Sequence, residues 1–317
     1  MVPSTNDSQS MNWHRSEASR WLDKGFIGVT GFFGIAVALV LLAIALRVSI
    51  DAFPAIQKFG LGFITTSRWN PVENLYGAWP QVYGTIVTSF IALLIAVPIG
   101  VGVALFLSED FLSPRIQRPI VFLVELLAAI PSVVFGLWGI FVLIPLLTPI
   151  GKWFHETLGW IPLFNTVPVG PGIYVAGLVL SIMILPIIAA ISRDALVAVP
   201  LELRQAAYGL GATRWETIFQ VILPAAFSGI VGGVMLALGR AMGETMAVTM
   251  VIGNANVASP SILAQGSTVS SLLANQFAEA SGLQISSLMY AALILFGLTL
   301  IVNILAELLV RSVRLKL

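Results

Sequence analysis

The sequence predicts an all-α, polytopic membrane protein that crosses the bilayer about six times. Of its 317 residues, 58% are hydrophobic and only 10% are charged, whereas soluble domains carry about 25% charged residues. The apolar residues gather in six long runs. These runs lack period-2 alternation, which excludes a membrane β-barrel, so helices must satisfy the backbone polar groups in lipid.

The N-terminal segment, residues 1–24, is polar and contains Trp13 and Trp21 among basic residues. It is either an amphipathic helix at the membrane interface or a simple tail. The transmembrane domain is predicted to follow over residues 25–317. Its first apolar run, 25–46, has no charged residue and exceeds the roughly 20 residues that a span needs. We expect this first span to end near residue 50.

Five further spans are predicted at about 83–107, 119–148, 172–192, 225–252 and 285–309. The third span of the chain, 119–148, contains Pro131 and Pro145, and prolines inside a membrane helix usually produce kinks. We therefore expect the third span to be one long, kinked helix.

The distribution of lysine and arginine orients the chain, because cytoplasmic loops are enriched in these residues. With a cytoplasmic N-terminus, six spans put both termini in the cytoplasm, and the basic residues then favour that side. The cytoplasmic side would hold Arg15, Arg20, Lys24, Arg115, Arg118, Arg193, Arg204, Arg214, Arg311, Arg314 and Lys316. The opposite side would hold Arg47, Lys58, Arg68 and Lys152.

Several kinds of chemistry are disfavoured. The chain has no cysteine, and His14 and His155 lie outside the apolar runs, which argues against a metal site. The runs contain no H-E-x-x-H motif and no nucleophile–base pair, which argues against an intramembrane enzyme. A net charge of +1 gives no support for nucleic-acid binding.

Two loops are unusual. Residues 51–82, on the extracytoplasmic side, are rich in tryptophan, tyrosine and proline, so they could anchor the protein at the interface or contact a partner.

Residues 193–224 form a polar cytoplasmic loop. Pro200 suits a helix start, Gly211 permits a sharp turn, and Thr213 with Glu216 forms a capping-box pattern. We expect two short helices joined by a turn.

The fifth span combines a packing signal with a charge. Small residues recur every four positions, which is typical of close helix packing in lipid. They are Gly229, Gly233, Ala237, Ala241, Thr245 and Thr249. Arg240 lies about 15 residues into the span, roughly 23 Å along the helix. A charge at this depth normally faces a cavity or a partner. Glu244, one turn later, either neutralises Arg240 in an ion pair or orients it toward an anion in transit.

The 193–224 loop resembles the cytoplasmic loop of ABC importer permeases, whose motif is Glu-Ala-Ala, three residues, Gly, nine residues, Ile, any residue, Leu-Pro. The matching residues here are Gln205, Ala206, Ala207, Gly211, Val221, Leu223 and Pro224. Gln205 replaces the glutamate and Val221 the isoleucine. The resemblance implies a type I importer permease fold, with a coupling loop that docks onto a separate ATPase. The chain has no G-x-x-x-x-G-K-[ST] phosphate loop of its own.

Two further stretches, 239–248 and 125–139, resemble phosphate-specific importers, most closely their C-type permease subunit. The resemblance implies inorganic phosphate as cargo and a bacterial inner-membrane location. The implied partners are an A-type permease, an ATPase dimer and an extracytoplasmic phosphate-binding protein. ATP and magnesium would bind the ATPase, and this chain would bind no cofactor. Near the cytoplasmic face, Glu125 would have a structural role at an inner gate, or would contact substrate.

Two alternatives remain at this point. The cargo could be another oxyanion, such as sulfate or molybdate. The chain could also be an ion-coupled secondary transporter or channel, in which case the 193–224 loop would have no ATPase to contact.

Overall fold

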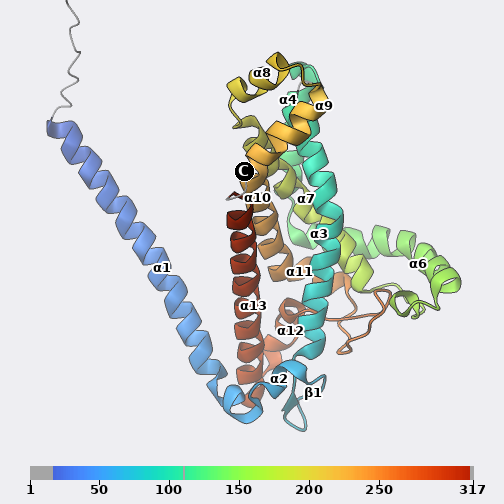
Figure 1. Ribbon diagram of the computed structural model, residues 1–317. Coiled ribbons are helices and arrows are strands. Elements are labelled where there is room, and N and C mark those ends of the chain that lie inside the picture. Colours follow the sequence, from blue (N-terminus) through green and yellow to red (C-terminus); the bar gives the residue numbers. More distant parts are fainter. Residues whose placement is uncertain (1–16, 110, 315–317) are drawn as a thin grey trace, which may run out of the picture. The chain divides into compact units, whose positions relative to one another are not determined.

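The computed structural model describes residues 17–109 and 111–314 (Figure 1). Within these residues six helices are long and apolar enough to cross a membrane, which confirms the predicted number of spans. They cover Lys24–Phe59, Trp79–Ser108, Ser132–Leu158, Ile173–Val197, Arg214–Gly243 and Leu283–Leu308. Of the predicted N-terminal segment, residues 1–16 lie outside the described part of the chain, and residues 17–24 are helical.

The first helix, α1 (Glu17–Phe59), is longer than the predicted span. It contains the boundary between two compact units, residues 1–50 and 51–317. Within the first unit the apolar side chains of α1 are exposed, including Phe32 at 67% and Leu41 at 60%. Exposed apolar side chains along a whole helix are expected where lipid surrounds it.

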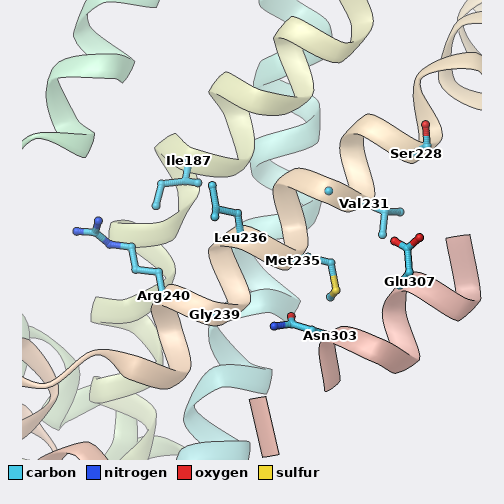
Figure 2. A pocket seen from close by; sticks show the side chains of 10 residues that line it. Ile187, Ser228, Val231, Met235, Leu236, Gly239, Arg240, Asn303 and Glu307 are labelled. Carbon is cyan, nitrogen blue, oxygen red and sulfur yellow. The ribbon is translucent and has the colours of Figure 1, made fainter. Parts of the chain in front are cut away.

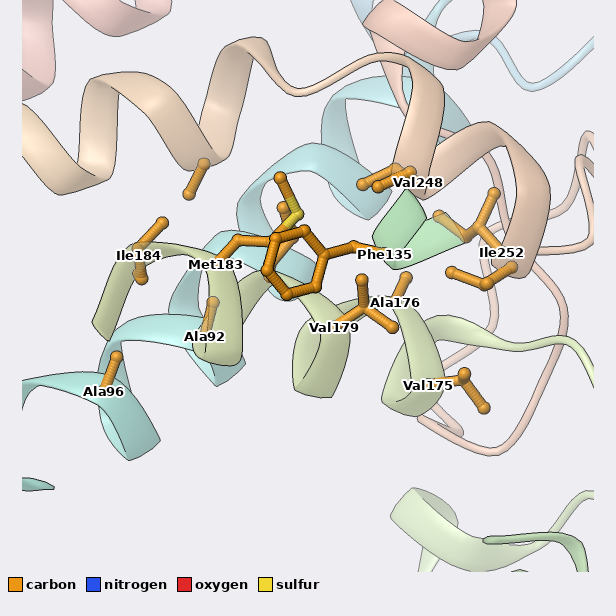
Figure 3. Packing of buried hydrophobic residues seen from close by; sticks show 14 of the residues in the cluster. Ala92, Ala96, Phe135, Val175, Ala176, Val179, Met183, Ile184, Val248 and Ile252 are labelled. Carbon is orange, nitrogen blue, oxygen red and sulfur yellow. The ribbon is translucent and has the colours of Figure 1, made fainter. Parts of the chain in front are cut away.

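The core of the second unit forms around α7 (Ile173–Val197), which packs along α3 (Trp79–Ser108) and α10 (Leu223–Gly243). Figure 3 shows alanines of α3, Ala92 and Ala96, near larger side chains of α7. Close approach depends on small residues: a Cβ added at Gly177 would lie 2.6 Å from a methyl carbon of Ile91. This is the packing that membrane helices use in place of a hydrophobic driving force.

The segment after α1 contains one short helix and a two-stranded antiparallel sheet. These are α2 (Gly62–Thr65), β1 (Trp69–Asn70) and β2 (Leu75–Tyr76). Its aromatic residues pack within the protein: Phe63 stacks on Tyr290 with centroids 4.6 Å apart, and Trp69 Nε1 donates to Gln276 Oε1 at 2.6 Å. Burial also raises the pKa of the Tyr76 phenol. These aromatics therefore brace α2 and the sheet against α12 and α13.

The expected single helix over 119–148 was wrong. The chain forms four successive segments instead: α4 (Pro114–Ala128), α5 (Ser132–Trp138), a π-helical segment (Gly139–Leu143) and α6 (Ile144–Leu158). Pro131 has no N–H and disfavours helical geometry in the residue before it, so the helix breaks at 129–131 rather than bending. The third span therefore begins at Ser132.

The fifth predicted span is also interrupted. Helix α10 ends at Gly243, Glu244 is extended, and α11 (Met246–Val251) follows as a separate short helix. Between α6 and α7 lies a 3₁₀ turn (Pro162–Phe164). The chain then continues through α12 (Val269–Gln276), a second 3₁₀ turn (Phe277–Glu279) and α13 (Leu283–Arg314).

Helix α12 is held tightly to the start of α3. The Val269 N–H donates to Thr85 Oγ1 at 3.1 Å. A Cβ at Gly84 would lie only 2.1 Å from the carbonyl oxygen of Ser267, so only glycine allows this approach. The loop between α11 and α12 is thereby fixed against the N-terminal end of α3.

Candidate functional site

The 193–224 loop forms the two short helices that its sequence predicts. Helix α8 (Leu201–Gly209) starts directly after Pro200, and Gly211 turns the chain with φ +85°. Helix α9 (Arg214–Thr217) begins with the predicted capping box: the Glu216 N–H donates to Thr213 Oγ1 at 3.3 Å, and the Thr213 N–H donates to Glu216 Oε2 at 2.7 Å. The local sequence thus determines both the turn and the second helix.

The motif residues of this loop divide into a buried and an exposed set. Ala207 is buried, whereas Gln205, Ala206 and Gly211 are exposed. The exposed side also carries large apolar side chains, with Tyr208 48% and Leu210 89% exposed. An apolar surface at the tip of a polar loop indicates contact with another protein.

The Leu223–Pro224 end of the motif joins the loop to the fifth span. A π-helical segment, Ile218–Ile222, precedes it, so the helix runs without interruption from Arg214 to Gly243. The other π-helical segment likewise lies just before a proline, Pro145. A proline has no N–H to donate and crowds the carbonyl four residues earlier, which explains the wider turn at both places.

The small-residue stripe packs as predicted over its first four members. A Cβ added to Gly229 would lie 2.5 Å from Ala195 Cβ, and a Cβ added to Gly233 would lie 3.0 Å from Ile191 Cβ. Ala237 and Ala241 belong to the buried core cluster. The stripe therefore faces α7, and the opposite face of α10 is left for other contacts.

The expected helical relation between Arg240 and Glu244 was wrong. Helix α10 ends at Gly243, and Glu244 has an extended conformation (φ −66°, ψ 127°). The Ala247 N–H donates to Glu244 Oε1 at 3.4 Å, at the start of α11. Among residues 17–109 and 111–314 no ion pair joins Arg240 and Glu244. Because α10 ends at Gly243, Glu244 does not lie one helical turn after Arg240 as the prediction assumed.

Arg240 is exposed and lines a cavity of about 1040 Å³ on the free face of α10 (Figure 2). The walls come from α7, α10 and α13, and they include small, apolar and polar side chains. The lining residues are Ile187, Ser228, Val231, Gly232, Met235, Leu236, Gly239, Arg240, Asn303 and Glu307. In Figure 2 the Arg240 guanidinium extends away from Asn303 and Glu307. Glu244 does not line this cavity.

Sequence analysis missed Asn303 and Glu307 as cavity residues. Both lie in the predicted sixth span, 285–309, and a polar or charged residue within a membrane helix is the same signal that selected Arg240.

Glu125 lies in α4 and not in the third span, because the chain breaks at 129–131. It is exposed, and it lines a small space of about 10 Å³ between α4, α3 and α7 together with Arg193. This space is about the size of one water molecule, so it could not itself hold an oxyanion. No cluster of possible metal ligands occurs in the part of the chain that the structure describes.

Comparison with known proteins gives three consistent results. Residues 96–315 match the family model described as "Binding-protein-dependent transport system inner membrane component". A phosphate transport system permease protein PstC of Pasteurella multocida is 45% identical over 297 residues, which are 92% of each chain. A protein of the same name from Haemophilus influenzae is 44% identical, covering 93% of this chain and 95% of its own.

A more distant relative comes from the archaeon Methanocaldococcus jannaschii: a probable phosphate transport system permease protein PstC, 38% identical over 80% of this chain and 82% of its own. Among solved structures, the fold is similar to a bacterial ABC transporter that imports the polysaccharide alginate. That match has a TM-score of 0.57 and 16% identity, covering 90% of this chain and 98% of the other. The MetNI methionine transporter gives a TM-score of 0.52 at 20% identity, covering 75% and 94%.

Proposed function

Because this chain belongs to the family of binding-protein-dependent transport system inner membrane components, we propose that it carries inorganic phosphate through the membrane as the permease subunit of an ATP-driven importer. The protein is a multi-pass transport component of the inner membrane. The observation that carries the phosphate proposal is an exposed arginine, Arg240, in a large cavity on one face of the fifth span.

Arg240 has the right chemistry for an oxyanion. Its planar guanidinium can donate two parallel hydrogen bonds to oxygens of one phosphate. Among the described residues no carboxylate is paired with it. An anion passing through the cavity would supply the missing counter-charge. The phosphate permeases that are similar over nine-tenths of this chain support phosphate as that anion.

The driving force would come from partner subunits. The chain has no phosphate loop, so ATP and magnesium would bind to an ATPase dimer and this subunit would hold no cofactor and catalyse no reaction. The exposed side of α8 and its turn, with Tyr208 and Leu210, would dock onto that ATPase. A second, A-type permease would close the cavity, and an extracytoplasmic binding protein would deliver phosphate.

Both termini would lie in the cytoplasm. The distribution of lysine and arginine supports this orientation, since it puts the 193–224 loop on the side of the ATPase. Closure of the ATPase dimer on ATP would move the loop and open the cavity outward, and hydrolysis would return it inward.

ATP-driven uptake of radiolabelled phosphate tests the proposal, in vesicles that contain this chain with its co-purified partners. We expect uptake that requires ATP and the outer binding protein and that excess sulfate or molybdate does not suppress. Suppression by either anion would reassign the cargo. If no ATPase co-purifies in mild detergent, and an ion gradient alone drives uptake, the importer mechanism would be wrong.

A further inference from the structure

A buried ion pair joins the 193–224 loop to the membrane helices. Arg204, in α8, donates from Nη1 to Glu109 Oε1 at 2.6 Å and from Nη2 to the carbonyl oxygen of Leu196 at 2.7 Å. The side chains of Arg204 and Glu109 are only 15% and 6% exposed. Salt screens such a buried pair far less than a surface pair. The two charge-assisted hydrogen bonds of the planar guanidinium define the geometry of the contact.

The partners of Arg204 lie at the ends of two core helices. Glu109 directly follows α3, and Leu196 lies in the last turn of α7. These two helices pack against one another and against α10, which carries Arg240. One side chain of α8 therefore reaches the ends of both helices that support the cavity-lining span.

Helix α8 has few other attachments. Ala207 is its only buried residue. Among the residues that the structure describes, Arg204 is also the only α8 residue whose side chain forms a hydrogen bond. Helix α8 also contacts α9 and the π-helical segment, whose Ile218 and Ile222 pack in a buried cluster with Ala104 of α3 and Leu196 of α7. Arg204 is the direct polar link from α8 to the ends of α3 and α7.

We propose that the Glu109–Arg204 ion pair is the joint through which displacement of α8 is transmitted to α3 and α7. This inference rests on the proposed function, since it assigns the source of displacement to an ATPase docked on α8. Arg204 and Glu109 are positioning residues: they touch neither substrate nor nucleotide. The two bonds of Arg204 point to different helices, so pulling or turning α8 moves both helix ends together.

A joint and a merely stabilising pair differ in one measurable quantity, the number of phosphate ions taken up per ATP hydrolysed. Loss of a stabilising pair lowers the amount of assembled complex, and uptake and hydrolysis fall together. Loss of a joint leaves the ATPase active but separates hydrolysis from transport. The ratio therefore falls only if the pair transmits movement.

The experiment uses Arg204→Met and Glu109→Gln in the complete complex, reconstituted in vesicles, with uptake and hydrolysis measured on the same sample. We expect the ratio to fall about tenfold in each variant, a typical size for lost coupling between sites. Arg204→Lys, which keeps the charge but not the two-pronged geometry, should give an intermediate ratio. The matched control is Asp194→Asn, which removes a carboxylate from an exposed pair with Arg193 at 3.4 Å, where Asp194 is 75% exposed.

The exchanged variant, Glu109→Arg with Arg204→Glu, keeps the proposal testable if the single variants do not assemble. A glutamate at position 204 restores the ion pair but cannot donate to the Leu196 carbonyl, so we expect assembly to recover and the ratio to rise to the intermediate value of Arg204→Lys. Recovery of assembly with a ratio as low as in the single variants overturns the joint. A wild-type ratio in Arg204→Met also overturns it. The proposed function fails separately, if the wild-type complex shows no ATP-driven phosphate uptake.

Discussion

Two arginines of the second unit, residues 51–317, differ in their burial and in their ion pairing. Arg204, in α8, is nearly buried and bonded to Glu109 and to a backbone carbonyl. Arg240, in the fifth span, is exposed to a cavity and has no ion-pair partner among residues 17–109 and 111–314. The first charge is satisfied within the chain. The second is left for something that the chain itself does not supply.

The energetic consequences differ accordingly. Removing one partner of a buried ion pair costs about 3–5 kcal/mol, because the other charge remains buried without compensation. A charged side chain at the centre of a membrane helix costs about 2.5–3.5 kcal/mol, and such side chains normally face a cavity or a partner. Arg240 lies in the last turn of α10 and lines such a cavity, whereas the charges of Arg204 and Glu109 compensate one another within the chain.

The largest effect is expected for Arg240→Ala. Removing a charged hydrogen-bond donor that no residue replaces should lower phosphate uptake by about 100-fold or more. Membrane insertion and assembly should not change, because Arg240 is exposed and contributes to no packed core. Uptake in vesicles measures the first effect and co-purification of the partners the second. Normal uptake would remove Arg240 from the transport path.

Glycines on opposite faces of α10 test whether one face packs and the other remains open. In Gly229→Val the new side chain would collide with Ala195, since even a Cβ would lie 2.5 Å away. We expect a loss of about 1–3 kcal/mol in stability, seen as a lower melting temperature in detergent. Gly232→Val is the matched variant: nothing lies within 4 Å of its Cβ, and it lines the cavity. Gly232→Val should keep the wild-type melting temperature and lose phosphate uptake. Equal melting temperatures for Gly229→Val and Gly232→Val would contradict the assignment of one packed and one open face.

Replacing Pro224 probes the connection between the two regions. Pro224→Ala restores an N–H and removes the ring, so the π-helical segment Ile218–Ile222 can relax to a regular α-helix. The loop would then turn relative to α10 by about 100°, one residue of an α-helix. We expect phosphate uptake per ATP to fall a few-fold while the melting temperature is unchanged or higher. An unchanged ratio would show that the π turn has no part in coupling.

The smallest effect is expected for Glu244→Gln. Glu244 accepts a hydrogen bond from the Ala247 N–H at 3.4 Å and does not pair with Arg240, and the glutamine carbonyl can accept the same bond. Uptake should stay within about threefold of wild type, the scale of one weakened hydrogen bond. A loss as large as that of Arg240→Ala would mean that the two residues act together during transport.

Local features of the fold followed from the sequence because they depend on neighbouring residues. Apolar runs located six spans, and Thr213 with Glu216 specified the start of α9. The four-residue spacing of Gly229, Gly233, Ala237 and Ala241 predicted a packing face. In each case hydrophobicity or a hydrogen bond within one turn is sufficient.

Tertiary structure alone decided what those elements do together. The breaks at Pro131 and Gly243 are tolerated because neighbouring helices pack around them, and they separate Glu125 from the third span and Glu244 from Arg240. Arg204 and Glu109 are 95 positions apart, and Asn303 reaches the Arg240 cavity from another helix. No periodicity relates such residues, because their contacts result from how whole helices pack and not from spacing along the chain.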